Sequence, residues 1–193
     1  MWKPRPSEGC SRCCFPHIDA CMKTFASLLA IFGILGASPQ VHASQPTAEP
    51  EVAAAIKAPG VSVVHLWAPW CSNCQAELKS GGWTKMLKDN PQVRFLFVSI
   101  WSAGDDGRPL LTKYGIGEQA NVMILADPGP RTGAGKLKRF LDLPVTWIPT
   151  TWVYKAGDLR YALNYGEVRF PVLQQFIEDT NSEWSHKTDK PAE

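Results

Sequence analysis

The chain has 193 residues, of which 45% are hydrophobic, and a formal net charge of +2. This length and composition suit one globular domain with a full core. After the four basic and two acidic residues up to Ala43 are set aside, 16 residues of each sign remain. A neutral balance lacks the basic surface that nucleic-acid binding needs, so we expect no nucleic-acid partner.

Residues 22–43 have the pattern of a targeting segment. Met22-Lys23 gives a short basic start, the stretch 25–36 is apolar, and Val41-His42-Ala43 gives a small-x-small-like end, so residues 22–43 are typical of a secretory signal peptide. We therefore expect a periplasmic or otherwise exported protein that has no stable membrane span after signal cleavage. An uncleaved anchor is the alternative, although the apolar stretch is short compared with the roughly 20 residues of a span.

Cysteine usage sets residues 1–21 apart from the rest of the chain. They hold four of the six cysteines, and Cys10-x-x-Cys13 with a nearby histidine also resembles a metal knuckle. We interpret residues 1–21 as a spurious or extended N-terminus, because an ordinary signal peptide begins at Met22. The remaining chain has only Cys71 and Cys74, which is too few for a disulfide scaffold.

Helices and strands are predicted throughout residues 51–181, between the segments 44–50 and 182–193, which we expect to be mobile. In chain order they are helix 51–58, strand 61–67, helix 71–88 with a break at Gly81-Gly82, strand 93–100, helix 108–114, strand 122–125, helix 135–141, strand 150–154, strand 159–165 and helix 170–179. The first two strands are apolar on both faces, which indicates a buried parallel pair with a right-handed crossover. The last two strands form a hairpin.

The motif Trp70-Cys71-Ser72-Asn73-Cys74 follows the first strand and opens a helix. A helix start stabilises a thiolate at Cys71 through its free N–H groups and its dipole. Cys74 lies one turn later on the same face, where it is placed to attack a mixed disulfide formed at Cys71. This pattern favours a redox-active dithiol; a structural disulfide and half of a zinc site are the alternatives.

The element order, the W-C-x-x-C motif and Ile148-Pro149-Thr150 before the hairpin together resemble the thioredoxin superfamily. The inserted α-β-α, the Asp127-Pro128-Gly129 turn and the run 149–151 look most like its exported TlpA/ResA/DsbE-type branch. The resemblance covers residues 51–181. It implies an α/β, thioredoxin-like fold with a central mixed β-sheet flanked by helices and an α-β-α insertion before the cis-proline hairpin.

The resemblance also implies roles for individual residues. Cys71 and Cys74 match the active-site pair, and Trp70 matches the aromatic residue before it. Pro149 matches a proline that is cis in this family and faces the disulfide; a trans proline at a strand start is the alternative. Backbone groups around Ile148 and Thr150 would then bind a substrate chain by β-augmentation.

Two further residues are candidates for handling the proton of Cys74. Glu77 completes a C-x-x-C-x-x-E pattern, and its carboxylate would exchange a proton with Cys74. A solvated helix glutamate is the alternative. His65 stands six residues before Cys71, where the family carries an acid or an asparagine, and it would act as a base or as a hydrogen-bonded core histidine.

We expect an exported thiol–disulfide oxidoreductase that reduces protein disulfides and needs neither cofactor nor metal. Ser72-Asn73 places no cation between the cysteines, whereas strongly oxidising relatives keep a histidine there. The resemblance implies protein thiol clients, apocytochrome c among them, and a membrane thiol donor of the DsbD/CcdA kind. The alternatives are a disulfide oxidant or isomerase, a copper metallochaperone, and a non-catalytic assembly module.

Overall fold

The computed structural model describes residues 47–117, 119–164 and 166–182. The predictions for residues 1–21, for the signal peptide 22–43 and for the tail after residue 182 lie outside this part. Across the three described ranges, none of the helices has the length and apolar character that a membrane span requires. The first helix begins at Glu49, so the last two residues of the segment expected to be mobile are helical.

A five-stranded mixed sheet forms the centre of the domain, with the strand order β3-β2-β1-β6-β7. The strands are β1 Val61–Trp67, β2 Arg94–Ser99, β3 Val122–Ala126, β6 Thr150–Lys155 and β7 Asp158–Leu163. The first three strands run parallel to one another, whereas β6 is antiparallel to β1 and β7 is antiparallel to β6. This is the predicted thioredoxin-like arrangement, and β1 has the predicted bounds.

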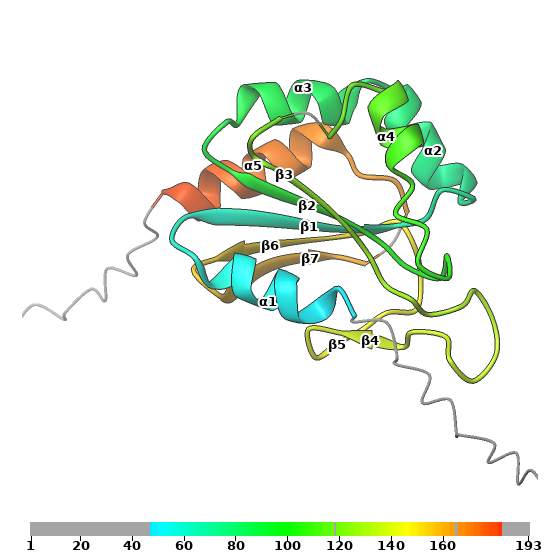
Figure 1. Cartoon of the computed structure of the whole chain (residues 1–193). Helices are drawn as coiled ribbons and strands as arrows, with labels where there is room; N and C mark the ends of the chain where they lie inside the picture. Colours follow the sequence, from blue (N-terminus) through cyan, green and yellow to red (C-terminus); the bar gives the residue numbers. More distant parts are fainter. Residues whose placement is uncertain (1–46, 118, 165, 183–193) are drawn as a thin grey trace, which may run out of the picture. The chain divides into compact units, whose positions relative to one another are not determined.

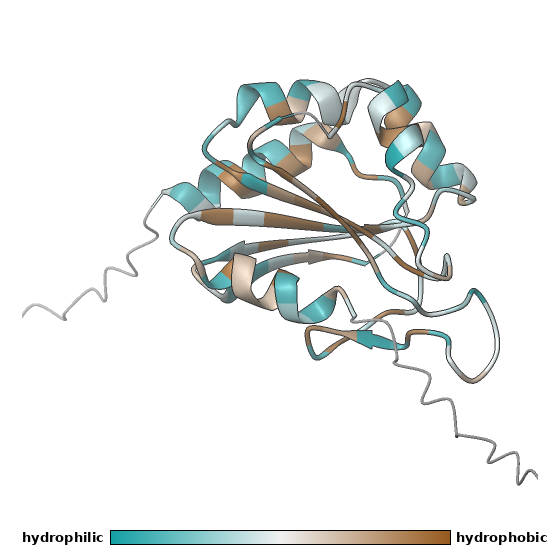
Figure 2. Cartoon of the chain, in the orientation of Figure 1, coloured by the Kyte–Doolittle hydropathy of each residue, from teal (hydrophilic) through white to brown (hydrophobic). Residues whose placement is uncertain are grey.

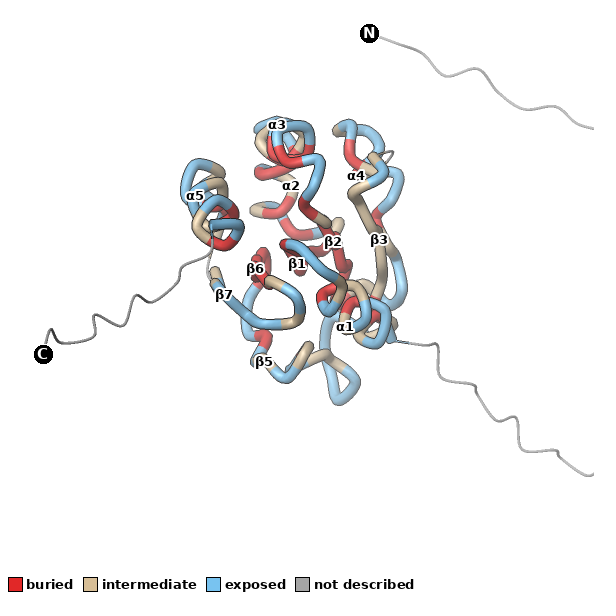
Figure 3. The backbone as a smooth tube through the Cα atoms, turned by 90° about the vertical axis from the view of Figure 1, so that its left-hand side faces the viewer, coloured by how far each residue is buried: buried red, intermediate tan, exposed pale blue. Residues whose placement is uncertain are grey.

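Helices cover both faces of the sheet (Figure 1). They are α1 Glu49–Lys57, α2 Ser72–Lys79, α3 Gly82–Asp89, α4 Arg108–Lys113 and α5 Phe170–Asn181. Figures 1 and 3 place α2, α3 and α5 on one face and α1 on the other. The central strands are therefore shielded from water on both sides.

This shielding explains the composition of the strands. Every residue of β1 is buried, and so is every residue of β2 after Arg94. Figure 2 shows hydrophobic residues concentrated in these strands. Burial on both faces is what a continuous apolar run indicates, in contrast to the alternating pattern of a half-exposed strand.

The predicted break at Gly81-Gly82 is confirmed, because α2 and α3 are separate helices. Gly81 adopts φ +74°, a conformation that glycine tolerates better than other residues. Gly82 is required for a different reason: a Cβ there would lie 2.1 Å from the Phe170 ring. The two glycines therefore let the chain turn and bring α3 close to α5.

The predicted helix 135–141 is wrong, and the last part of the insertion is a small hairpin. Strands β4 Arg139–Phe140 and β5 Leu143–Pro144 pair antiparallel. Leu141 and Asp142 between them have φ values of 47° and 61°. Positive φ at both central residues is the conformation of a type I′ hairpin turn, which is incompatible with a helix. The insertion is thus helix α4, strand β3 and this hairpin.

Candidate active site

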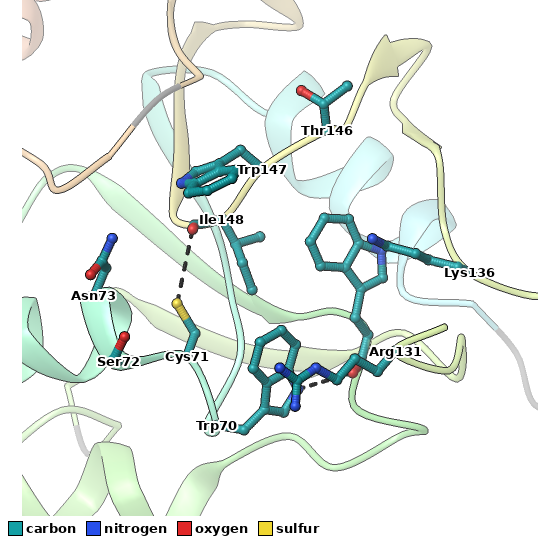
Figure 4. A pocket seen from close by; sticks show the side chains of 10 residues that line it. Trp70, Cys71, Ser72, Asn73, Arg131, Lys136, Thr146, Trp147 and Ile148 are labelled. Atoms are coloured by element: carbon teal, nitrogen blue, oxygen red, sulfur yellow. Dashed lines mark hydrogen bonds between the residues drawn. The ribbon is translucent and has the colours of Figure 1, made fainter. Parts of the chain in front are cut away.

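Cys71 lies at the junction between the end of β1 and the start of α2. It is the N-cap residue of α2, and its Sγ accepts a hydrogen bond from the N–H of Cys74 over 3.4 Å. The same Sγ lies 3.9 Å from the carbonyl oxygen of Ile148, as the dashed line in Figure 4 shows. The sulfur of Cys71 thus lies at the helix start, between one backbone N–H donor of α2 and a carbonyl oxygen of the loop before β6.

Cys74 lies one helical turn further on, in a much more closed environment. Its exposure is 1%, compared with 8% for Cys71, and both thiols are free. Burial is the main cause that raises the pKa of Cys74 above its ordinary value, and a hydrogen bond with Cys71 and the charges of Cys71 and Glu77 add to it. Cys74 therefore stays protonated at neutral pH unless a base removes its proton.

The loop before β6 lies opposite Cys71. The peptide bond between Ile148 and Pro149 is cis, and the Ile148 carbonyl oxygen is the group nearest to the thiol. Trp147 is 49% exposed. Thr150 is buried, and its hydroxyl donates to the Trp147 carbonyl oxygen over 3.0 Å. Ile148 therefore faces the cysteine, whereas the Thr150 side chain points back into its own loop.

Glu77 is buried, so the solvated alternative is wrong for this residue. Trp83 Nε1–H donates to its Oε2 over 3.2 Å, and the N–H of Val168 donates to its Oε1. Burial raises the pKa of Glu77 to about 7, even though these two hydrogen bonds act in the opposite direction. The carboxyl group is thus able to bind or release a proton near neutral pH.

His65 contacts Glu77 directly. Its Nε2 lies 3.3 Å from Glu77 Oε2, and its Nδ1 lies 2.9 Å from Thr151 Oγ1. Thr151 reaches this position because it is the register partner of His65 between β1 and β6. The ring packs against Trp83 with 4.5 Å between centroids. Burial lowers the pKa of His65 to about 3, so the imidazole is neutral at physiological pH.

The structure thus joins two candidates that the sequence treated as alternatives. Thr151, His65 and Glu77 form one buried polar chain, which we call the Glu77 network. Because a neutral imidazole donates from one nitrogen and accepts at the other, a proton on Glu77 fixes which ring nitrogen is protonated. Sequence reasoning missed Thr151 because strand register is not visible in a single sequence. It also did not include Trp83 among the site residues, although the N–H of Trp83 donates to Glu77.

A groove of about 340 Å³ opens beside Cys71 (Figure 4). It is lined by the residues from 70 to 73, by Trp101, Arg131 and Lys136, and by the residues from 146 to 148. Trp70, 38% exposed, and Trp147 are its most exposed aromatic residues. Trp101, Arg131 and Lys136 were not predicted here, because no local pattern connects them with the C-x-x-C motif.

No protein-family model matches the chain. No curated protein matches it either. Among solved structures, it is similar to a secreted Mycobacterium tuberculosis disulfide oxidoreductase described as homologous to E. coli DsbE, with 19% identity, TM-score 0.45, and coverage of 62% of this chain and 81% of that one.

Two further structures show comparable similarity. One is a putative thiol:disulfide interchange protein DsbE from Chlorobium tepidum, with 19% identity, TM-score 0.48, and coverage of 66% and 84%. The other is StoA from Bacillus subtilis, with 15% identity, TM-score 0.44, and coverage of 61% and 81%. At these identities and TM-scores, the thioredoxin-like assignment rests on the strand order and on the site geometry described above.

Proposed function

We propose that this protein is an exported thiol–disulfide oxidoreductase that reduces disulfides of client proteins with the Cys71/Cys74 dithiol. The observation that carries the proposal is the placement of the two sulfurs. Cys71 caps α2 and borders an open groove, whereas Cys74, one helical turn later, is almost completely buried. A nucleophile that meets the substrate and a resolving thiol that is hidden from it are the two parts that disulfide exchange requires.

Two exchange steps follow from this placement. The Cys71 thiolate attacks one sulfur of the client disulfide, and the other client sulfur leaves as a thiolate. Cys74 then loses its proton and attacks Cys71, which forms the Cys71–Cys74 disulfide and releases the second client sulfur as a thiolate. Two electrons pass from the protein dithiol to the client, and the two client thiolates take up protons according to their pKa.

The second step needs a base, because burial raises the pKa of the Cys74 thiol. Glu77 follows one turn later on α2, and its charge influences the Cys74 thiol. We assign Glu77 as the acceptor of this proton. His65 is a positioning residue: it contacts the Glu77 carboxylate and fixes its orientation.

The reducing direction is supported by the residues between the cysteines. Ser72-Asn73 places no cation between the cysteines, so these two residues do not stabilise the dithiol at the expense of the disulfide. A reductase outside the cytosol needs a source of electrons, for which we propose a membrane thiol donor of the DsbD/CcdA kind. Apocytochrome c is the proposed client, because its C-x-x-C-H motif must be reduced before haem attachment.

The reduction potential of the Cys71/Cys74 couple tests this direction. It is measured by equilibration with glutathione buffers, in the full chain with Cys10, Cys13, Cys14 and Cys21 replaced by serine. We expect a value near that of thioredoxin, about −270 mV, rather than that of DsbA, about −120 mV. A value at the DsbA end would overturn the reductase assignment while leaving an oxidant or isomerase.

Donor and client are identified by trapping. In a Cys74→Ala variant, Cys71 should remain in mixed disulfides with its partners, which mass spectrometry identifies. The matched control is the double variant Cys71→Ala/Cys74→Ala, which should trap nothing through this site. Recovery of the same partners from both variants would contradict the assignment of Cys71 as the nucleophile.

A further inference from the structure

Two cations lie on tryptophan faces in the groove beside Cys71. The Arg131 guanidinium carbon is 3.8 Å from the centroid of the Trp70 ring, as Figure 4 illustrates. Lys136 Nζ is 3.9 Å from the centroid of the Trp101 ring. Both cations come from the loop between β3 and β4, so a segment distant in sequence supplies one wall of the groove.

Hydrogen bonds fix the two tryptophans that carry these cations. Trp70 Nε1–H donates to the Trp101 carbonyl oxygen over 3.0 Å, and Trp101 Nε1–H donates to the Leu137 carbonyl oxygen over 2.8 Å. Trp101 also has φ 58°, an uncommon conformation for a large side chain. These bonds connect the active-site loop, the loop after β2 and the cationic loop, so the wall is already formed without a ligand.

The charge of the groove is unbalanced. None of the residues that line it is acidic. Over the ranges that the structure describes, neither Arg131 nor Lys136 has a carboxylate within ion-pair distance. A cation stacked on an indole keeps most of its N–H donors free for another group. Two cations without an acidic partner therefore face the space that a client must enter to reach Cys71.

We propose that this groove selects client segments that carry an acidic side chain close to the reactive cysteine. This inference rests on the proposed function and adds its substrate class. The client sulfur has to approach Cys71 Sγ between α2 and the Ile148 loop, so the residues next to the client cysteine pass along the groove. A carboxylate there pairs with Arg131 in a bidentate manner or with Lys136, while the exposed ring of Trp147 contacts the apolar part of the segment.

The cations also have a simple structural interpretation, in which they only pack on the indoles and contribute about 0.5–1 kcal/mol each. The two interpretations differ in what they predict for neutral substrates. Packing alone affects all substrates equally, whereas charge recognition affects only the acidic ones. A comparison of substrates is therefore more informative than a change in stability.

The test uses three cyclic C-x-x-C disulfide peptides that differ only in the residue flanking the first cysteine, which is Glu, Gln or Lys. The neutral compound 2-hydroxyethyl disulfide is the reference substrate. The protein is the reduced full chain with the four N-terminal cysteines replaced by serine, and a Cys71→Ser version gives the background. The second-order rate constant is measured by stopped flow at low and high salt.

We expect the Glu peptide to react about tenfold faster than the Gln peptide at low ionic strength, and the Lys peptide to react more slowly than both. Salt should reduce these differences. The variant Arg131→Gln/Lys136→Gln should lose the preference, measured as the ratio of the Glu-peptide rate constant to the Gln-peptide rate constant. Arg131→Lys should retain a large part of it, and Lys138→Gln, which removes one positive charge from the same loop outside the groove, should leave it nearly intact.

Equal rates for the Glu and Gln peptides would overturn the inference while leaving the proposed function in place. An equal loss on all substrates in the double variant would also overturn it, because that result indicates packing alone. If the protein reduces neither the peptides nor 2-hydroxyethyl disulfide, the proposed function fails and this inference fails with it.

Discussion

Cys71 and Cys74 lie one helical turn apart, yet their surroundings are opposite in character. Cys71 borders an open groove with tryptophans and two cations. Cys74 faces the interior, where Glu77, His65 and Thr151 form a closed polar network. The groove side is built from loops that are distant in sequence, whereas the Glu77 network is built on α2 and on the central strands β1 and β6.

We therefore propose that the two sides of the motif control different steps of disulfide exchange. In our proposal, the groove side selects the disulfide that reaches Cys71. The Glu77 network is proposed to control how readily Cys74 gives up its proton once a mixed disulfide has formed. Changes on one side should therefore alter one step and spare the other, and the following predictions are ordered from the largest effect to the smallest.

Loss of the nucleophile should have the largest effect. Replacing Cys71 by Ser should lower the reduction of 2-hydroxyethyl disulfide roughly a thousandfold or more, because the covalent step then has no thiolate. Cys74→Ser should keep the first step and accumulate a mixed disulfide at Cys71, which intact-mass spectrometry detects. Retention of activity in Cys71→Ser together with its loss in Cys74→Ser would reverse the two roles.

Removal of the base should slow only the resolving step. With a glutathione mixed disulfide preformed at Cys71, Glu77→Gln should slow glutathione release about a hundredfold at neutral pH, because no carboxylate accepts the Cys74 proton. In the protein that retains Glu77, the rate of glutathione release should rise with pH as Glu77 ionises, with a midpoint near its pKa of about 7. This inflection should be absent in the variant.

The control for this experiment is Glu51→Gln, an exposed residue on α1. It should leave both the rate and its pH profile unchanged. The idea that Glu77 handles the proton would be abandoned if Glu77→Gln slowed the attack of Cys71 on a disulfide as much as it slowed the resolving step.

A packing change tests the support of the Glu77 network. Gly82→Ala places a methyl group against the Phe170 ring, which stacks edge-on against Trp83 with 5.3 Å between centroids. Overpacking of this kind costs about 1–3 kcal/mol. Urea denaturation should show this loss, while Lys88→Ala on the exposed side of α3 should change stability by less than about 0.5 kcal/mol. An unchanged free energy of unfolding in Gly82→Ala would mean that Phe170 moves aside freely.

The pH dependence of stability should show the smallest effect. Burial takes the pKa of His65 from 6.5 to about 3, so the unfolded chain binds the extra proton and stability rises with pH between these values. Burial takes the pKa of Glu77 from 4.5 to about 7, so the folded state binds the extra proton and stability falls as pH rises from 4.5 to 7. The two slopes oppose each other between pH 4.5 and 6.5.

Above pH 6.5, of these two residues only Glu77 still changes the free energy of unfolding with pH, by at most about 1.4 kcal/mol per pH unit. Urea titrations at closely spaced pH values should show a modest fall in the free energy of unfolding up to about pH 7.5, and Glu77→Gln should abolish it. A fall of equal size in both proteins would assign it to other groups.

The sequence was most informative where the pattern is local. The continuous apolar run predicted β1, the glycine pair predicted the break between α2 and α3, and the W-C-x-x-C motif predicted the helix start that holds Cys71. The helix predicted at 135–141 was wrong because its apolar spacing resembles a helix, whereas the positive φ angles of Leu141 and Asp142 make a turn.

Contacts between segments that are distant in sequence could not be predicted from the sequence. The partnership of His65 with Thr151 depends on the register of β1 against β6, and the stacking of Arg131 on Trp70 depends on the path of a long loop. Neither property has a signature in one sequence. The sequence thus identified Cys71, Cys74, Glu77 and His65 as candidates, while the contacts of Thr151, Arg131 and Lys136 became visible only in three dimensions.

Selective alkylation tests the central claim, the contrast between the two thiols, most directly. The reduced protein is treated briefly with iodoacetamide under native conditions at neutral pH, and labelling at each cysteine is quantified by peptide mass spectrometry. We expect modification of Cys71 with Cys74 almost unlabelled, because only Cys71 lines the groove, whereas burial raises the pKa of the Cys74 thiol. Equal labelling of the two thiols, or faster labelling of Cys74, would contradict the account.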